Sequence, residues 1–258
     1  MKESSSIALV TGVSRDKGIG AAICRILARD GMDIFFTHWG TYDGEDGCGK
    51  EEGFPSVFAK ELEGLGVRTA HMEADLSRQD APALILQTAT QSLGLPRVLI
   101  HNATYESPTD FRTMRMETLD MHYQVNNRGT IMLSVEFARR FEEVYAGAED
   151  GRIVFMVSKG PDPHNLAYTA TKGMLTAITE PLATALAPVG ITVNSVDPGP
   201  TDSGWITDEI RENLLPLFPS GRIGTPEDAA RLIRFLASED SRWVTGQVLR
   251  SEGGFIGK

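Results

Sequence analysis

Short apolar runs alternate with longer segments of helical periodicity along this chain, and this alternation limits the folds open to it more than any other feature. The runs are rich in β-branched residues. Most are apolar on both faces, as strands covered by helices on both sides should be. Such strands pair in parallel and are joined by right-handed crossover helices. The sequence therefore predicts an α/β fold with one doubly wound, seven-stranded parallel sheet and helices on both faces.

The predicted strands span residues 7–10, 34–37, 69–72, 98–102, 153–157, 191–196 and 247–250. The predicted helices span residues 18–29, 54–65, 81–93, 117–145, 166–187 and 226–237. Because no composition break, linker or repeat divides the chain, residues 1–258 are expected to form a single domain. Segments 38–53 and 200–223 break the alternation and follow strand ends, where such sheets bind ligands. We expect 200–223 to be a substrate loop.

Charge and composition exclude several function classes. The 35 acidic residues outnumber the 25 basic ones and give a net charge of −10, which opposes binding to phosphate backbones and anionic lipid. Nucleic-acid and membrane partners are therefore not expected. The apolar runs are far shorter than the roughly 18 residues of a membrane span, and the polar N-terminus favours a cytoplasmic protein. Cys24 and Cys48 form no CxxC pair and the histidines lack metal-ligand spacing, so we expect reduced thiols and no metal.

The first predicted strand runs directly into a glycine-containing turn, residues 11–20, and then into an apolar-periodic helix. Glycines let a backbone turn tightly and approach a pyrophosphate, while the free N–H groups at a helix N-terminus favour the anion. Gly12, Gly18 and Gly20 are the expected contributors. A P-loop is excluded because no Gly-Lys-Ser/Thr closes the motif. The turn therefore predicts a dinucleotide site.

Tyr168 and Lys172 are four residues apart at the start of a predicted helix, which places both side chains on one face. A phenol with a pKa of about 10 exchanges protons poorly at neutral pH, but a neighbouring ammonium favours the phenolate. Such a tyrosine is suited to give a proton to a carbonyl oxygen. The strand 153–157 delivers Ser158 beside it, with a hydroxyl suited to hold the same oxygen.

Further motifs follow in order: Asp75-Leu76 after the third strand, His101-Asn102-Ala103 after the fourth, Asn126 in the long helix, residues 193–199, and a C-terminal pattern over 221–228 and 235–254. With these motifs the chain resembles a short-chain dehydrogenase/reductase over essentially its whole length. The resemblance is to the branch that includes the 3-oxoacyl-ACP reductases. It implies a Rossmann-like fold.

The resemblance implies a role for each matching residue. Tyr168 is the expected general acid/base, Lys172 lowers its pKa and binds the nicotinamide ribose, and Ser158 orients the substrate oxygen. Asn126 is expected to support a water-linked proton path to Lys172. The expected cofactor contacts, besides Tyr168 and Lys172, are Gly12, Ser14, Arg15, Gly18, Ile19, Gly20, His38, Asp75, Leu76, Asn102, Ala103, Pro198, Gly199 and Thr201. The long helices 117–145 and 166–187 match those that relatives pair across two-fold axes, so a homotetramer is expected.

The nicotinamide cofactor is expected to be NADP(H), with NAD(H) as the alternative. NAD-selective relatives place a carboxylate at the end of the second strand, and residues 37–39 contain none. Arg15 and Lys17 offer cations that suit a 2′-phosphate. The opposing feature is an acidic stretch, expected to be a solvated loop, that contains Asp43, Glu45 and Asp46.

Together these features predict an NADP(H)-dependent carbonyl reductase that acts on a small-molecule ketone and forms a secondary alcohol. Two alternatives remain open. One is an NAD-dependent alcohol, sugar or steroid dehydrogenase. The other, from a different class, is a cofactor-binding regulatory or partner protein without turnover. Retention of Asn126, Ser158, Tyr168 and Lys172 together favours an enzyme.

Overall fold

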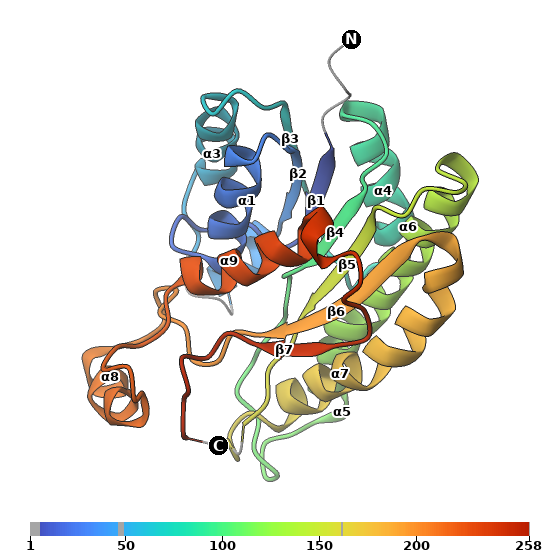
Figure 1. The fold of residues 1–258 in the computed structure, drawn as a ribbon. Coiled ribbons are helices and arrows are strands. Elements are labelled where there is room, and N and C mark those ends of the chain that lie inside the picture. The colour runs from blue at the N-terminus through green and yellow to red at the C-terminus, as the bar shows by residue number, and fades with distance from the viewer. Residues whose placement is uncertain (1–5, 46–48, 161, 258) are drawn as a thin grey trace.

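The computed structural model describes residues 6–45, 49–160 and 162–257, and within them seven strands form one parallel sheet (Figure 1). The strand order is β3-β2-β1-β4-β5-β6-β7, and every neighbouring pair is parallel. Helices cover both faces. The predicted α/β, Rossmann-like fold class is confirmed.

The strands are β1 Ile7–Val10, β2 Asp33–His38, β3 Thr69–Glu73, β4 Val98–His101, β5 Gly151–Met156, β6 Ile191–Asp197 and β7 Val248–Arg250. The α-helices are α1 Ile19–Arg29, α2 Gly40–Glu45, α3 Phe54–Glu63, α4 Ala81–Ser92, α5 Met116–Tyr123, α6 Thr130–Val144, α7 Leu166–Leu186, α8 Asp208–Leu214 and α9 Pro226–Ala237. The predicted strands agree with these bounds to within two residues at each end.

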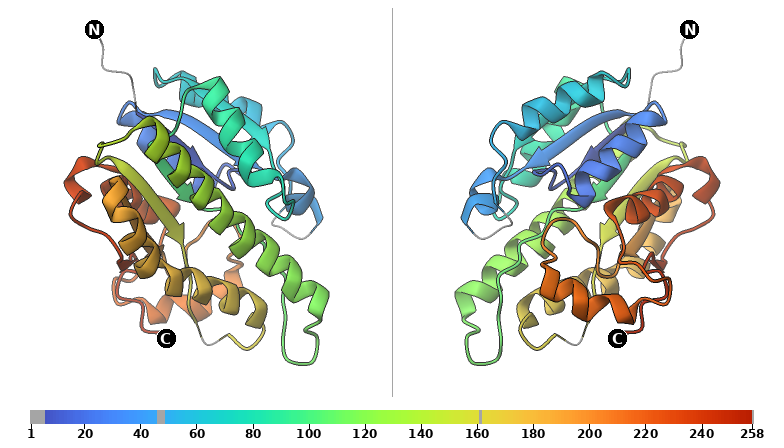
Figure 2. Two further views of the ribbon diagram at one scale, coloured as in Figure 1. Left: turned by 90° about the vertical axis from the view of Figure 1, so that its right-hand side faces the viewer. Right: turned by 90° about the vertical axis from the view of Figure 1, so that its left-hand side faces the viewer.

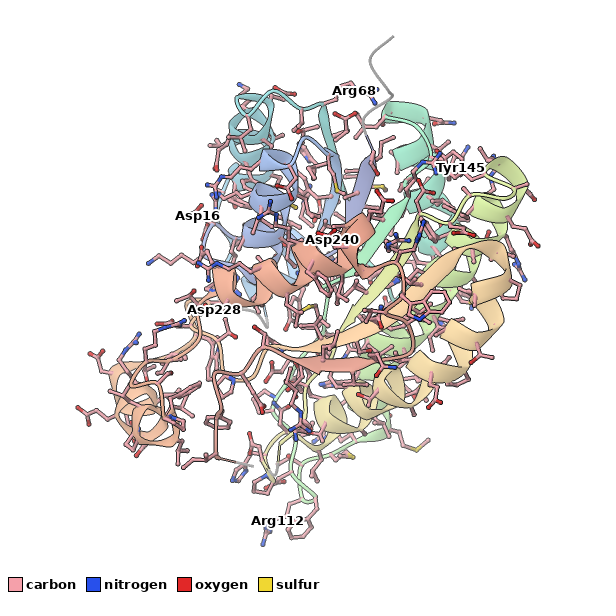
Figure 3. All side chains as sticks on the ribbon, in the orientation of Figure 1. Asp16, Arg68, Arg112, Tyr145, Asp228 and Asp240 are labelled. Atoms are coloured by element: carbon pink, nitrogen blue, oxygen red, sulfur yellow. The ribbon has the colours of Figure 1, made fainter. Side chains whose placement is uncertain are left out.

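Two apolar cores lie on opposite faces of the sheet (Figure 2). Successive strand side chains point to opposite faces, so Val10 enters one core and Leu9 the other. The helices α1, α3 and α9 fill the first core with Ile23, Leu27, Phe58, Ile233 and Leu236. The helices α4, α6 and α7 fill the second with Ile85, Leu133, Phe137, Phe141 and Leu175. Exposed charged side chains such as Asp16, Arg112 and Asp240 lie outside both cores (Figure 3).

The structure differs from the sequence prediction in three places. The helices α2 and α8 lie within 38–53 and 200–223, where loops were expected. The predicted helix 117–145 is continuous in Figure 2 but contains a π-helical turn, Gln124–Gly129, between α5 and α6. This turn brings Gly129 so close to the chain after β3 that a Cβ there would lie 2.4 Å from the Leu76 carbonyl oxygen. A short element with few apolar residues, such as α2, leaves no periodicity to detect.

The chain leaves β1 in one direction toward β2 and β3, and later in the other toward β4–β7. This reversal opens a crevice at the C-terminal ends of β1 and β4, where doubly wound sheets bind ligands. Gly12 follows β1 there with φ of +73°, and a Cβ on it would lie 2.5 Å from the Ala103 Cα. Only glycine fits so close an approach.

Cys24 is a buried free thiol, as expected for a core residue. Cys48 and Asp46 lie outside the described residues, as does the side chain of Glu45. Across the described ranges, no helix combines the length and the apolar character that a membrane crossing requires. The same ranges contain no group of three or more His, Cys, Asp or Glu side chains placed to bind a metal ion.

Candidate functional site

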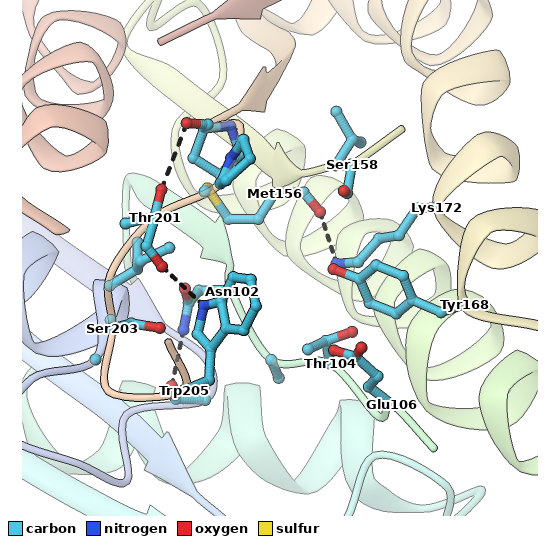
Figure 4. A pocket seen from close by; sticks show the side chains of 18 of the residues that line it. Asn102, Thr104, Glu106, Met156, Ser158, Tyr168, Lys172, Thr201, Ser203 and Trp205 are labelled. Carbon is cyan, nitrogen blue, oxygen red and sulfur yellow. Dashed lines mark hydrogen bonds between the residues drawn. The ribbon is translucent and has the colours of Figure 1, made fainter. Parts of the chain in front are cut away.

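A cavity of about 1030 Å³ lies at the C-terminal ends of the strands, and most of the predicted site residues line it (Figure 4). These residues are Gly12, Ser14, Arg15, Gly18, Ile19, Gly20, His38, Leu76, Asn102, Ala103, Ser158, Tyr168, Lys172, Pro198, Gly199 and Thr201. The volume is at the upper end of the range for ligand and cofactor pockets. Two predicted residues, Asp75 and Asn126, are not among those that line it.

Ser158, Tyr168 and Lys172 converge on one wall of this cavity (Figure 4). Tyr168 and Lys172 occupy the first two turns of α7, and Ser158 follows β5. The Lys172 Nζ donates a hydrogen bond to the Met156 carbonyl oxygen at 2.8 Å and lies 5.4 Å from the centroid of the Tyr168 ring. The Ser158 side chain lies on the same wall as Tyr168 and lowers the pKa of its phenol. The three side chains predicted to take part in proton transfer therefore lie together in one cavity.

Burial shifts the two titrating groups of this cluster in opposite directions. It lowers the pKa of Lys172 to about 8, against the opposing effect of the Glu106 carboxylate. Burial raises the pKa of the Tyr168 phenol above its usual 10; Glu106 adds to this, and Ser158 opposes it. The expectation that Lys172 lowers this pKa was therefore wrong, because burial dominates the shift. Tyr168 therefore holds its proton at neutral pH, which is the state required to protonate a carbonyl oxygen.

The end of β4 holds the glycine turn in place. The Asn102 Nδ2 donates hydrogen bonds to the carbonyl oxygens of Thr11 at 3.1 Å and Gly12 at 2.7 Å. The Thr11 Oγ1 accepts from the backbone N–H groups of Asn102 and Ala103, both at 3.1 Å. Beside this network, the N-terminus of α1 opens into the cavity with Gly18, Ile19 and Gly20 in its wall. A cradle of close glycine backbone and a helix N-terminus fits the pyrophosphate of a nicotinamide dinucleotide.

Asn126 lies in the π-helical turn and is 1% exposed. Its Oδ1 accepts from the Tyr105 N–H at 2.7 Å and from the Thr104 hydroxyl at 3.2 Å. Its Nδ2 donates to the Tyr105 carbonyl at 2.9 Å and to the Thr171 hydroxyl at 3.1 Å. The side chain therefore ties the loop after β4 to α7. Its proposed part in a proton path to Lys172 stays a prediction.

Asp75 uses its side chain within its own loop. Its Oδ1 accepts a hydrogen bond from the Ser77 N–H at 2.8 Å, in the turn that leads toward α4. The adjacent Leu76 does line the cavity. A contact between Asp75 and the adenine stays a prediction, whereas Leu76 is placed where such a contact is available.

The cavity wall also contains residues to which the sequence prediction gave no role, among them Trp39, Tyr42 and Glu106, and it contains Asp43. Asp43 was expected in a solvated loop, and this was wrong, because its side chain on α2 is only 8% exposed. Burial raises the pKa of this carboxyl, against the opposing effects of Ser14 and the Arg15 guanidinium. The Asp43 Oδ2 is buried without a hydrogen-bond partner, so an acceptor is available beside the glycine turn.

Comparisons with known proteins agree with this geometry. The family model described as Enoyl-(Acyl carrier protein) reductase matches residues 12–256. The uncharacterized oxidoreductase YjdA of Bacillus subtilis is 49% identical over 253 residues, which are 97% of this chain and 96% of that protein. The chain belongs to the short-chain dehydrogenase/reductase family, and it is an oxidoreductase of the class that interconverts CH–OH and C=O groups with a nicotinamide cofactor.

Two solved structures of this family are similar along nearly the whole chain. A blue fluorescent protein from a metagenomic library, in complex with NADPH, has a TM-score of 0.84 and 29% identity, covering 97% of this chain and 98% of the other. The acetoin dehydrogenase YohF from Salmonella typhimurium has a TM-score of 0.82 and 29% identity, covering 98% of both chains.

The lowered pKa of Lys172 predicts a pH-dependent contribution to stability. Because Lys172 titrates near pH 8 in the folded protein and near 10.5 when unfolded, the unfolded chain holds more protons between these values. The free energy of unfolding contributed by Lys172 should therefore rise with pH from about 8 to 10. Above pH 10 the raised pKa of Tyr168 acts in the opposite direction.

Urea unfolding of the parent and Lys172→Met across pH 7.5–10 measures this contribution. The difference in free energy of unfolding should shift in favour of the parent as the pH rises. The exposed Lys60→Met on α3 is the matched control for the loss of one lysine. A parent-minus-Lys172→Met difference that stays constant over this range contradicts the assignment.

Proposed function

We propose that this protein is an NADP(H)-dependent oxidoreductase that reduces a ketone to a secondary alcohol. The observation that carries the proposal is the convergence of Ser158, Tyr168 and Lys172 on one wall of a cavity that also contains the glycine cradle. A cofactor-binding protein without turnover has no need for a protonated phenol beside a buried ammonium. This arrangement therefore favours turnover.

A nicotinamide cofactor held at Gly12, Gly18 and Gly20 would supply the hydride for reduction of the carbonyl carbon. The Tyr168 Oη donates its proton to the carbonyl oxygen, so that one hydride and one proton convert C=O to CH–OH. The Ser158 hydroxyl donates a hydrogen bond to the same oxygen and fixes the substrate beside Tyr168. The Lys172 ammonium stabilises the phenolate that Tyr168 becomes, and burial strengthens that interaction.

The preference for NADP(H) is supported by Arg15. It lines the cavity next to Ser14, and its Nη1 donates to the Ser203 carbonyl at 3.1 Å, which leaves further guanidinium N–H groups for a phosphate. The strand β2 ends at His38 without a carboxylate. Asp43 opposes the preference, since its buried carboxylate lies near the same cation. We place the stronger influence with Arg15, which also partly offsets the Asp43 charge.

The 3-oxoacyl-ACP reductase-like resemblance suggests a ketone, and the acetoin dehydrogenase neighbour suggests a small one. The substrate is therefore proposed to be a small carbonyl compound. The segment 200–223 contributes Pro200, Thr201, Ser203, Trp205 and Leu214 to the cavity, in keeping with a substrate loop. The cytoplasmic location and the single domain over residues 1–258 stay predictions.

A homotetramer is also proposed. Apolar side chains are exposed on the outer surface of the helical layer: Met116, Leu119 and Tyr123 on α5, Met132 on α6 and Met174 on α7. Exposed apolar side chains gathered on neighbouring helices mark association surfaces. Light scattering coupled to size exclusion should report four chains per particle at micromolar concentration. A monomer would contradict this proposal without affecting the catalytic one.

Replacement of Tyr168 by Phe tests the catalytic assignment. The change keeps the ring and removes only the proton-donating hydroxyl, so kcat should fall by about 10²-fold or more while the cofactor dissociation constant changes little. Steady-state reduction of an accepted ketone measures the effect, with the exposed Tyr123→Phe as the matched control. Near-parental turnover by Tyr168→Phe would remove Tyr168 from the mechanism.

The cofactor preference is tested with two variants that should change the preference for NADPH in opposite directions. Dissociation constants for NADPH and NADH should show that the parent prefers NADPH. The variant Arg15→Ala should lose about tenfold or more of that preference, since it loses a charge-assisted hydrogen bond to phosphate. Asp43→Asn should increase the preference, because a carboxylate no longer faces the 2′-phosphate. Tighter NADH binding by the parent overturns the choice of NADP(H).

A further inference from the structure

Glu106 is a carboxylate inside the cavity that the mechanism above does not use. It follows β4 in the loop that leads to α5 and lies beside Tyr168 in Figure 4. Its side chain is exposed to the cavity and not buried in the core. Its charge is felt at both proton-transfer groups, because it raises the pKa of Tyr168 and of Lys172. A ketone whose carbonyl oxygen is bound at Tyr168 therefore lies close to the Glu106 carboxylate.

Glu106 is held in position from two other parts of the chain. Its backbone N–H donates to the Tyr42 hydroxyl at 3.1 Å, and that hydroxyl donates to the Glu106 carbonyl oxygen at 3.2 Å. The Asn165 Nδ2 donates to the Glu106 Oε1 at 2.6 Å. Tyr42 is itself fixed by ring contacts with Trp39 at 5.7 Å and Tyr105 at 5.2 Å. The carboxylate is thus pre-organised before any substrate arrives.

The chemistry of this position favours one kind of substrate. A carboxylate accepts about four hydrogen bonds, and Asn165 provides one, so capacity remains for a donor on the substrate. A hydroxyl or an ammonium group next to the ketone satisfies that capacity. A substrate carboxylate beside Glu106 meets a like charge, which disfavours binding.

We infer that Glu106 makes this enzyme selective for small ketones that carry a hydroxyl or ammonium group next to the carbonyl, and that it excludes ketones bearing a carboxylate there. The inference rests on the proposed function and names the substrate class of the same site. Tyr42 is a positioning residue in this selection, because its hydroxyl is hydrogen-bonded to the backbone N–H and carbonyl of Glu106.

Four small ketones of similar size test the inference with the cofactor present: hydroxyacetone, aminoacetone, butanone and pyruvate. The parent should show a kcat/KM for hydroxyacetone that exceeds that for butanone by about tenfold or more, because a site built to bond a hydroxyl rejects its apolar isostere. Pyruvate should be the poorest of the four. Aminoacetone distinguishes an ammonium preference from a hydroxyl preference.

The variant Glu106→Gln keeps the size of the side chain and removes its charge. It should reduce the hydroxyacetone-to-butanone ratio by about tenfold or more and raise the relative rate with pyruvate. Its pH–rate profile should move to lower pH, since loss of the Glu106 charge lowers the pKa of both Tyr168 and Lys172. A merely structural role for Glu106 would leave this profile unmoved.

Two further variants complete the test. Tyr42→Phe should raise KM for hydroxyacetone more than it lowers kcat, because Glu106 remains present but is less well placed. Glu63→Gln, on the exposed side of α3 outside the cavity, removes an equal charge and should leave every ratio unchanged.

The outcomes separate this inference from the proposed function. If the parent reduces ketones through Tyr168 but does not distinguish hydroxyacetone from butanone, the role of Glu106 is wrong and the proposed function stands. An unchanged ratio in Glu106→Gln has the same meaning. If the parent reduces none of the four ketones, both the inference and the proposed function are overturned.

Discussion

The close approach of the backbone after β1 to the backbone after β4 is the constraint on which the rest of the site depends. Gly12 lies where a Cβ would meet the Ala103 Cα at 2.5 Å, and the Asn102 Nδ2 donates hydrogen bonds to the carbonyl oxygens of Thr11 and Gly12. This contact fixes the crevice between the C-terminal ends of β1 and β4, where the strand order reverses. The cofactor cradle, the start of α1 and the loop that carries Glu106 are all positioned relative to it.

Burial then gives the cavity its chemistry. A lysine and a tyrosine four residues apart occur on many helices, but here Lys172 is buried and Tyr168 is half-buried, and their pKa values move in opposite directions. The hydrogen bond to the Met156 carbonyl oxygen holds the ammonium 5.4 Å from the centroid of the Tyr168 ring. The proton to be transferred is therefore on the Tyr168 phenol, which lines the cavity, and the ammonium that stabilises the phenolate is on the buried Lys172.

Most of this arrangement was predictable from the sequence, because buried strands must be apolar and a phosphate turn needs glycine. The positions of Ser158, Tyr168 and Lys172 around one cavity follow from the strand and helix that carry them. The roles of Tyr42, Asp43 and Glu106 did not follow. Tyr42 bonds Glu106 across 64 residues of sequence, and α2 is too short and too polar to show a period. Such long-range contacts leave no local pattern.

The hydrogen bonds between Tyr42 and Glu106 join two walls of the cavity, one from the segment after β2 and one from the loop after β4. Tyr42 packs on Trp39, which faces the region expected to receive the adenosine, while Glu106 lies beside Tyr168. With the cofactor and the substrate bound as proposed, the Tyr42–Glu106 hydrogen bonds connect their two sites. By thermodynamic reciprocity, any change in substrate affinity that the cofactor produces through this link is matched by an equal change in cofactor affinity produced by the substrate.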